Sequence, residues 1–218
     1  MVRRLGFAGL WLLFLGYATF LAPGDGPETL DLIVRLSTGQ VAGINPVIVA
    51  LFNLMGVLPL AYSCLLYADG RGQKIWAWPF AAGAFAVGAF ALIPYLGLRQ
   101  DNPGWIGPKS RTIRFWDSRY TAIAIFMAAL ILVLYGVLAG DWADFGRQWQ
   151  GSKFIHVMSL DFCLLSLLGS ELVPDDMARR GMVDSRLLTV VQWVPLFGLL
   201  VYLVVRPRLP EVVETVAV

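Results

Sequence analysis

The chain has 218 residues, of which 58% are hydrophobic and only 15% are charged, and its formal net charge is +2. A soluble domain of this length carries about 25% charged residues, so the composition excludes an ordinary soluble domain and indicates a membrane protein. The small net charge, without a long basic block in the sequence, excludes a nucleic acid as the expected partner.

Six apolar runs follow one another along the chain. About 18 or more apolar residues are needed to cross the hydrocarbon core of a membrane, and helices are the spanning structure that runs of this length form. The sequence therefore predicts an all-α fold, a polytopic transmembrane helix bundle with five or six spans, in one domain over residues 1–218. The expected spans lie near residues 5–22, 44–67, 76–98, 120–139, 154–173 and 187–205.

The N-terminal run allows two interpretations. Arg3 and Arg4 precede it, as basic residues precede the apolar part of a secretory signal. The run is longer than the usual signal core of about 7–15 residues, so a retained span is the preferred interpretation. The segment that follows, near residues 28–41, places Leu30 and Ile33 on one side and predicts a short helix in the membrane interface.

Neither the orientation nor an internal repeat is settled by the sequence. If all six runs span, lysines and arginines are divided almost evenly between the two sides, and the positive-inside rule gives no orientation. Asp69–Gly72 looks like Asp176–Gly181, and Ile93–Leu98 looks like Val194–Leu199. These pairs indicate a weak three-plus-three repeat with its loops on opposite sides, or only the common recurrence of Gly, Pro and Arg in membrane loops.

The fifth run carries the candidate chemistry. His156 is the only histidine, and Asp161 follows it within the same apolar stretch. A charge near the bilayer centre costs about 2.5–3.5 kcal/mol on insertion scales, so Asp161 marks a candidate functional position. The two residues would be catalytic acid–base partners if the protein is an enzyme, and structural hydrogen-bonding groups if it is not. They project from opposite sides of the helix, which predicts that this helix is central in the bundle.

Other polar residues are candidates for contact with a ligand or a lipid headgroup. Asp176 precedes Arg179 and Arg180 at helical spacing, which indicates either a solvated loop end or a clamp for an acidic group. Asn53 and Gln192 are amides inside apolar runs, where they can meet Asp161 or a ligand. One histidine without a ligand cluster predicts no metal site.

The sequence is similar to two membrane protein families. The first resemblance rests on segments of both halves, and it is to a family of uncharacterised integral membrane proteins of cyanobacteria and plastids. It implies the plasma or thylakoid membrane of a cyanobacterium-like cell and carries no activity. The segments are Phe52–Pro59, Asp69–Arg71, Trp78–Phe80, Gly88–Tyr95 and Lys153–Phe162.

The second resemblance covers the C-terminal third. His156, Asp161-Phe162, Asp176–Gly181, Pro195–Tyr202 and Arg206 resemble segments of the plant-type neoxanthin synthase membrane family. This resemblance implies that His156 and Asp161 match that family's His and Asp, and that a carotenoid is the ligand class.

These observations favour an integral membrane accessory protein of a photosynthetic-type membrane. It would act in assembly, or bind a lipid, a carotenoid or another pigment, with the bilayer and other membrane proteins as partners. No cofactor is certain, and carotenoid or chlorophyll are the candidates. The alternatives are a membrane enzyme that modifies isoprenoids or carotenoids with His156 and Asp161, and a small proton-coupled transporter that uses Asp161.

Overall fold

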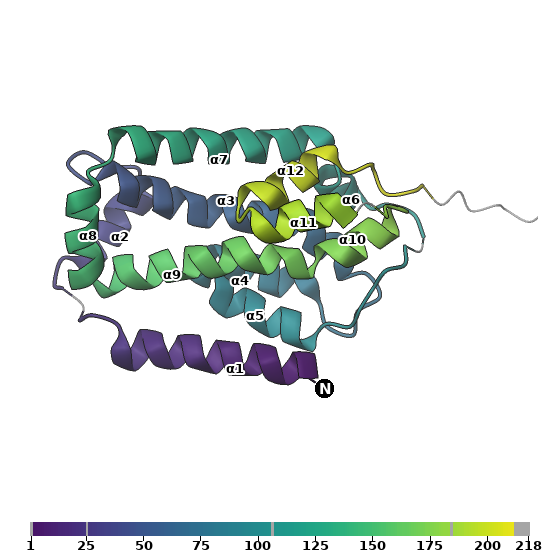
Figure 1. The fold of residues 1–218 in the computed structure, drawn as a ribbon, viewed down its shortest axis with the longest axis horizontal. Coiled ribbons are helices and arrows are strands. Elements are labelled where there is room, and N and C mark those ends of the chain that lie inside the picture. The colour runs from purple at the N-terminus through teal and green to yellow at the C-terminus, as the bar shows by residue number, and fades with distance from the viewer. Residues whose placement is uncertain (1, 25, 106, 184, 212–218) are drawn as a thin grey trace, which may run out of the picture.

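A computed structural model describes residues 2–24, 26–105, 107–183 and 185–211, and these residues form helices without any strand. The helices lie roughly side by side as a bundle, shown in Figure 1. Four of them are long and apolar enough to cross a membrane: Val2–Leu21, Pro46–Asp69, Arg119–Ala139 and Lys153–Arg179. The predicted all-helical fold is thus confirmed, and its apolar helices are compatible with a membrane protein. The predicted number of five or six spans is not confirmed.

The first half of the chain contains two long helices, a short helix and a helical hairpin. α1 ends in a π-helical turn, α2 occupies the segment where a short interfacial helix is expected, and α4 and α5 form the hairpin. The bounds are α1 Val2–Gly16 with Tyr17–Leu21, α2 Thr29–Ser37, α3 Pro46–Asp69, α4 Ala77–Val87 and α5 Ala89–Leu98.

The second half repeats this order of elements after the short helix α6. A long helix is followed by a short one, then by a long helix extended by a 3-10 turn, and then by a second hairpin. The bounds are α6 Arg111–Trp116, α7 Arg119–Ala139, α8 Trp142–Gly151, α9 Lys153–Leu168, the turn Gly169–Glu171, α10 Val173–Arg179, α11 Ser185–Trp193 and α12 Phe197–Val205.

The expected third and sixth spans are these two hairpins. Gly88 ends α4 with φ of 53°, a left-handed conformation that favours glycine, and the chain then turns back into α5. In the second hairpin Pro195 cannot donate a helical hydrogen bond, and Leu196 has φ of 63°. Periodicity alone predicts one long helix for each run, because an apolar hairpin and an apolar span have similar compositions.

The two hairpins enter the bundle from the same end. Arg99 follows α5 and pairs with Asp69 at the end of α3, so the chain returns to the end from which α4 starts. Arg179, the last residue of the second long helix of the other half, contacts both Asp69 and Asp176. The loops of the two halves therefore lie together, and the expectation of an inverted repeat with loops on opposite sides is wrong. The halves are related as a parallel repeat.

Helix α3 is the most buried of the long helices, not α9 as the sequence suggests. About 67% of its apolar window is buried, against 44% for the helix that includes α9. α3 packs against α4, α7 and α9, and the hydroxyl of Tyr62 donates a hydrogen bond to the carbonyl oxygen of Leu165 on α9. The side chains of Asn45 and Ser152 cap α3 and α9 at matching places in the repeat.

Candidate functional site

A large cavity lies between the two halves of the chain, next to the tip of the first hairpin. Its volume is about 880 Å³, within the usual range for small-molecule sites of about 300–1,000 Å³. Residues of α2, α3, α9 and the hairpin line it, and most are apolar. They include Phe52, Asn53, Phe85, Phe90, Val157 and Asp161. We call this space the first cavity.

Asp161 is the only acidic residue among the described residues that line the first cavity. Its side chain is buried, and Oδ1 accepts a hydrogen bond of 2.7 Å from the backbone N–H of Ala89, the first residue of α5. Among the described residues, Oδ2 has no hydrogen-bond partner and the carboxyl has no ion-pair partner. A carboxyl group in this state can accept a hydrogen bond from a ligand, or exchange a proton with one.

The tip of the hairpin is shaped to fit this carboxyl group. A Cβ atom at Gly88 would overlap the carboxyl of Asp161, so the close approach requires glycine in addition to the positive φ. The approach brings the amino-terminal end of α5, which carries partial positive charge, directly onto Oδ1. The hairpin and α9 are therefore fixed to each other at Asp161.

His156 lies elsewhere, in an aromatic cluster near α8. Its Nε2 is 2.7 Å from the hydroxyl of Tyr17, and its Nδ1 is 3.0 Å from the carbonyl oxygen of Trp149. The imidazole ring also stacks on the Trp149 ring, with 4.1 Å between centroids. Both ring nitrogens are thus engaged, and His156 is not among the described residues that line the first cavity. His156 contacts Tyr17, whereas Asp161 contacts Ala89. The two residues of the predicted acid–base pair therefore have different partners.

The two predicted amide candidates are separated in the structure. Asn53 lines the first cavity, and its Nδ2 donates to the carbonyl oxygen of Val49 at 2.8 Å, which leaves its Oδ1 available to a ligand. Gln192 lies on α11 and is exposed on the outside of the bundle. Of these candidates, the structure therefore groups Asn53 with Asp161.

A buried ion-pair network occupies the end of the bundle from which the hairpins enter. In the first half, Asp69 accepts hydrogen bonds from the hydroxyl of Tyr95 at 2.6 Å and from Nε and Nη2 of Arg99 at 2.8 and 2.6 Å. Asp69 is fully buried and Arg99 is 3% exposed. These contacts hold the end of α5 against the end of α3.

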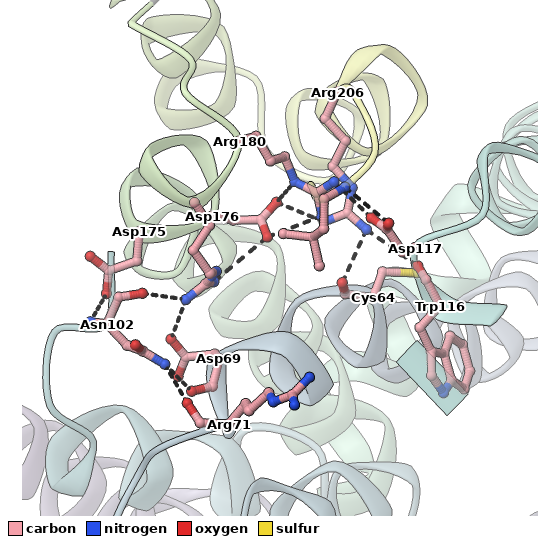
Figure 2. A network of polar contacts seen from close by, with 12 residues as sticks. Cys64, Asp69, Arg71, Asn102, Trp116, Asp117, Asp175, Asp176, Arg180 and Arg206 are labelled. Atoms are coloured by element: carbon pink, nitrogen blue, oxygen red, sulfur yellow. Dashed lines mark hydrogen bonds and ion pairs between the residues drawn. The ribbon is translucent and has the colours of Figure 1, made fainter. Parts of the chain in front are cut away.

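The second half repeats this arrangement around Asp176, and Figure 2 shows Asp176 between Arg180 and Arg206. The hydroxyl of Tyr202 donates to Asp176 at 2.6 Å, and Nη1 of Arg206 donates at 2.7 Å. The sequence separations are 26 residues from aspartate to tyrosine and 30 from aspartate to arginine in both halves. The sequence reasoning missed Tyr95, Arg99, Tyr202 and Arg206, although this repeated spacing could have revealed them.

The predicted candidates Arg179 and Arg180 join the two arrangements. Nη1 of Arg179 contacts Asp69, and its Nη2 lies 3.6 Å from Asp176. Arg180 pairs with Asp176 and with Asp117. Burial by itself lowers the pKa of Arg180, but the two carboxylates raise it above its usual range. The guanidinium therefore stays charged.

The network therefore holds the two halves together, and its carboxylates and guanidinium groups pair mostly with one another. Breaking one buried pair typically costs about 3–5 kcal/mol, because the remaining charge is left without a partner. The predicted solvated loop end is wrong, since Asp176 and Arg179 are buried. The alternative, a clamp for an external acidic group, has no cavity at Asp176 among the described pockets.

The described residues define a class: an all-helical protein whose four long apolar helices are compatible with a multi-pass membrane protein, with two hairpins and a mostly apolar cavity. Asp161 supplies the one carboxyl group among the described residues that line this cavity. Comparisons with protein family models, with curated proteins and with solved structures found no match to the chain.

Proposed function

We propose that this protein binds a lipid-like molecule in the first cavity, within the membrane. The main supporting observation is the carboxyl of Asp161, which lines a mostly apolar cavity and has an oxygen without a protein partner among the described residues. Such an oxygen selects a ligand with a hydroxyl or amine group on an apolar body. The function is then that of an integral membrane accessory protein, with binding as its main role.

The shape of the cavity supports an elongated ligand. Lys153 and Asp161 both line it from α9, eight residues apart, which corresponds to about 12 Å along a helix. Pro27 and Leu30, near the start of α2, lie on the same side as Lys153. The ligand would thus extend from the membrane surface to the tip of the hairpin, with apolar side chains along its length.

The distribution of basic residues supports one orientation in the membrane. Of the 17 lysines and arginines, Arg35, Arg147 and Lys153 belong to the end that carries α2 and α8, and the others belong to the end with the ion-pair network (Figure 1). The even division expected for six spans disappears because the two hairpins return their basic residues to one end. By the positive-inside rule we infer that the network end faces the cytoplasm.

The experiment is an extraction of the protein purified in mild detergent. Mass spectrometry of the extract should detect a bound molecule with a hydroxyl or amine group, and an absorbance spectrum tests the expected carotenoid or chlorophyll. The matched variant is Gly56→Phe: Gly56 lines the cavity and has free space at its Cβ position, so phenylalanine should fill the cavity without a clash. Equal amounts of ligand in both proteins would contradict the proposal.

A membrane enzyme is the second candidate function. The observation that favours it is the same carboxyl, which has no ion-pair partner among the described residues and can transfer a proton to or from a bound isoprenoid. In this case Asp161 acts without His156. Incubation of the purified protein with carotenoid substrates, followed by pigment chromatography, tests the reaction, and Asp161→Asn should abolish any conversion.

A further inference from the structure

Lys153 lines the first cavity at the end of the bundle that carries α2 and α8 (Figure 1). The other two basic residues of this end have carboxylate partners, since Arg35 pairs with Asp31 and Arg147 pairs with Asp144. Lys153 has no ion-pair or hydrogen-bond partner for its side chain among the described residues. Its Nζ atom is not among their buried polar atoms without a partner, so the ammonium group is accessible to a ligand.

The position of Lys153 makes this end of the cavity electropositive. Lys153 is the first residue of α9, and the amino-terminal end of a helix carries partial positive charge. A cation at this position is unfavourable by itself, whereas an anion next to it is favourable. Thr29, the first residue of α2, also lines the cavity, and its hydroxyl has no partner among the described residues and is accessible. An anionic group can accept hydrogen bonds from both side chains.

The repeat indicates that the fold requires neither of the two charged groups in the lining. The two aspartates of the ion-pair network fix the register, because each accepts from a tyrosine and an arginine at the same separations. In this register Pro46, the first residue of α3, corresponds to Lys153, and Leu54 corresponds to Asp161. The other half thus forms the equivalent long helix with apolar residues at both positions. The amine and the carboxyl group are therefore particular to the first cavity.

We propose that the ligand of the first cavity is a long-chain fatty acid with a hydroxyl group near the middle of its chain. This inference rests on the function proposed above and adds a second point of recognition. Lys153 pairs with the carboxylate of the ligand at the membrane surface, and the carboxyl of Asp161 accepts a hydrogen bond from the hydroxyl. The apolar lining between them, which includes Phe52 and Val157, contacts the hydrocarbon chain. The two polar positions are about 12 Å apart along α9, so one extended chain reaches both.

The experiment measures equilibrium binding of tritiated ligands to the full-length protein in mild detergent, by scintillation proximity. Three ligands of one chain length separate the two recognition groups. Ricinoleic acid has the carboxylate and the hydroxyl, its methyl ester lacks the charge, and oleic acid lacks the hydroxyl. Wild type should bind ricinoleic acid about two to five times more tightly than the ester, the usual effect of a partly exposed ion pair. It should bind ricinoleic acid about ten to 150 times more tightly than oleic acid, because a hydrogen bond to a carboxylate is stronger.

Variants of the two residues should affect different ligands. Lys153→Gln should weaken binding of ricinoleic acid and of oleic acid about two- to fivefold and leave the methyl ester unchanged, and Lys153→Arg should bind like wild type. Asp161→Leu should weaken binding of ricinoleic acid and of its ester and leave oleic acid unchanged. The matched control is Arg147→Gln, which removes a positive charge from the same end but outside the lining of the cavity, and it should change none of the three.

The repeat also supplies a control for occupation of the cavity. Gly56→Phe should abolish binding of all three ligands, whereas Cys163→Phe should not, because Cys163 is the corresponding residue of the other half and lines a separate cavity of about 450 Å³.

The inference is overturned if wild type binds the ester as tightly as ricinoleic acid, or if Lys153→Gln, folded by thermal unfolding, binds ricinoleic acid like wild type. An effect of Asp161→Leu on the ester would then leave the proposed function intact. Equal binding of the ligands to Gly56→Phe and wild type would instead contradict the proposed function itself.

Discussion

Removal of the Tyr202 hydroxyl tests whether the ion-pair network stabilises the fold. Tyr202→Phe keeps the ring in its buried place and deletes one hydrogen bond of 2.6 Å to Asp176. A hydrogen bond to a charged group contributes about 1.5–3 kcal/mol, and Asp176 keeps Arg180 and Arg206 as partners. For a chain of this size, each kcal/mol of lost stability lowers the melting temperature by about 2–4 °C. Tyr202→Phe should therefore lower the melting temperature by about 3–12 °C.

The assay is thermal unfolding in detergent, followed by tryptophan fluorescence. Tyr95→Phe deletes the matching hydrogen bond in the first half and should have a similar effect, whereas Tyr120, which is 80% exposed, provides the control Tyr120→Phe. Because Arg179 contacts both aspartates, the stability lost in the double variant should differ from the sum of the two single losses by about 0.5 kcal/mol or more. The reasoning is refuted if Tyr202→Phe and Tyr120→Phe unfold at the same temperature.

Three further predictions follow from other parts of the molecule. Gly88→Ala should lower the melting temperature by more than Tyr202→Phe does, because the new Cβ overlaps Asp161 at a positive φ; an unchanged melt would contradict the hairpin geometry. Hydrogen bonds from Asn45 and Gln148 hold the pKa of Asp144 below its usual range, so its stabilisation of α8 is present above about pH 3.9 and lost as pH falls through the lower folded-state pKa. Hydrogen exchange of α8 should show this acid dependence in wild type and not in Asp144→Asn. Reporter fusions after residue 211 should be cytoplasmic, and a fusion in the α2–α3 loop should not; the reverse would refute the orientation.

The membrane class follows from the sequence because it depends on composition and run length. The apolar runs predict α3, α7 and α9 close to where they lie. The hairpins could not be predicted in this way, since the turn at Gly88 depends on contact with Asp161, which is distant in sequence. The assumption of six spans also affected the predicted orientation, because each hairpin changes the side to which later loops are assigned.

The candidate site was predicted in part. Asp161 was selected because a charged residue in an apolar run is costly to bury and is often functional. The structure places it in the lining of the first cavity with Asn53. His156 was paired with it by proximity in sequence, yet its partners are Tyr17 and Trp149, which the apolar pattern does not mark. Asp69 was assigned to a loop, because a buried ion pair at a helix end has the same local composition as an exposed one.

Photolabelling of the first cavity is the most direct test of the central claim, that Asp161 binds a lipid-like ligand through a hydrogen-bond donor. The measurement uses a diazirine-bearing long-chain alcohol, with labelled residues of α3, α9 and the first hairpin mapped by mass spectrometry. Asp161→Leu introduces the residue that the repeat places at position 54, and Cys163→Phe is the control. A hydrogen bond to a carboxylate corresponds to about a ten- to 150-fold change in affinity, so Asp161→Leu should weaken alcohol labelling by about that factor. Labelling of the folded Asp161→Leu protein at the wild-type concentration would contradict the claim.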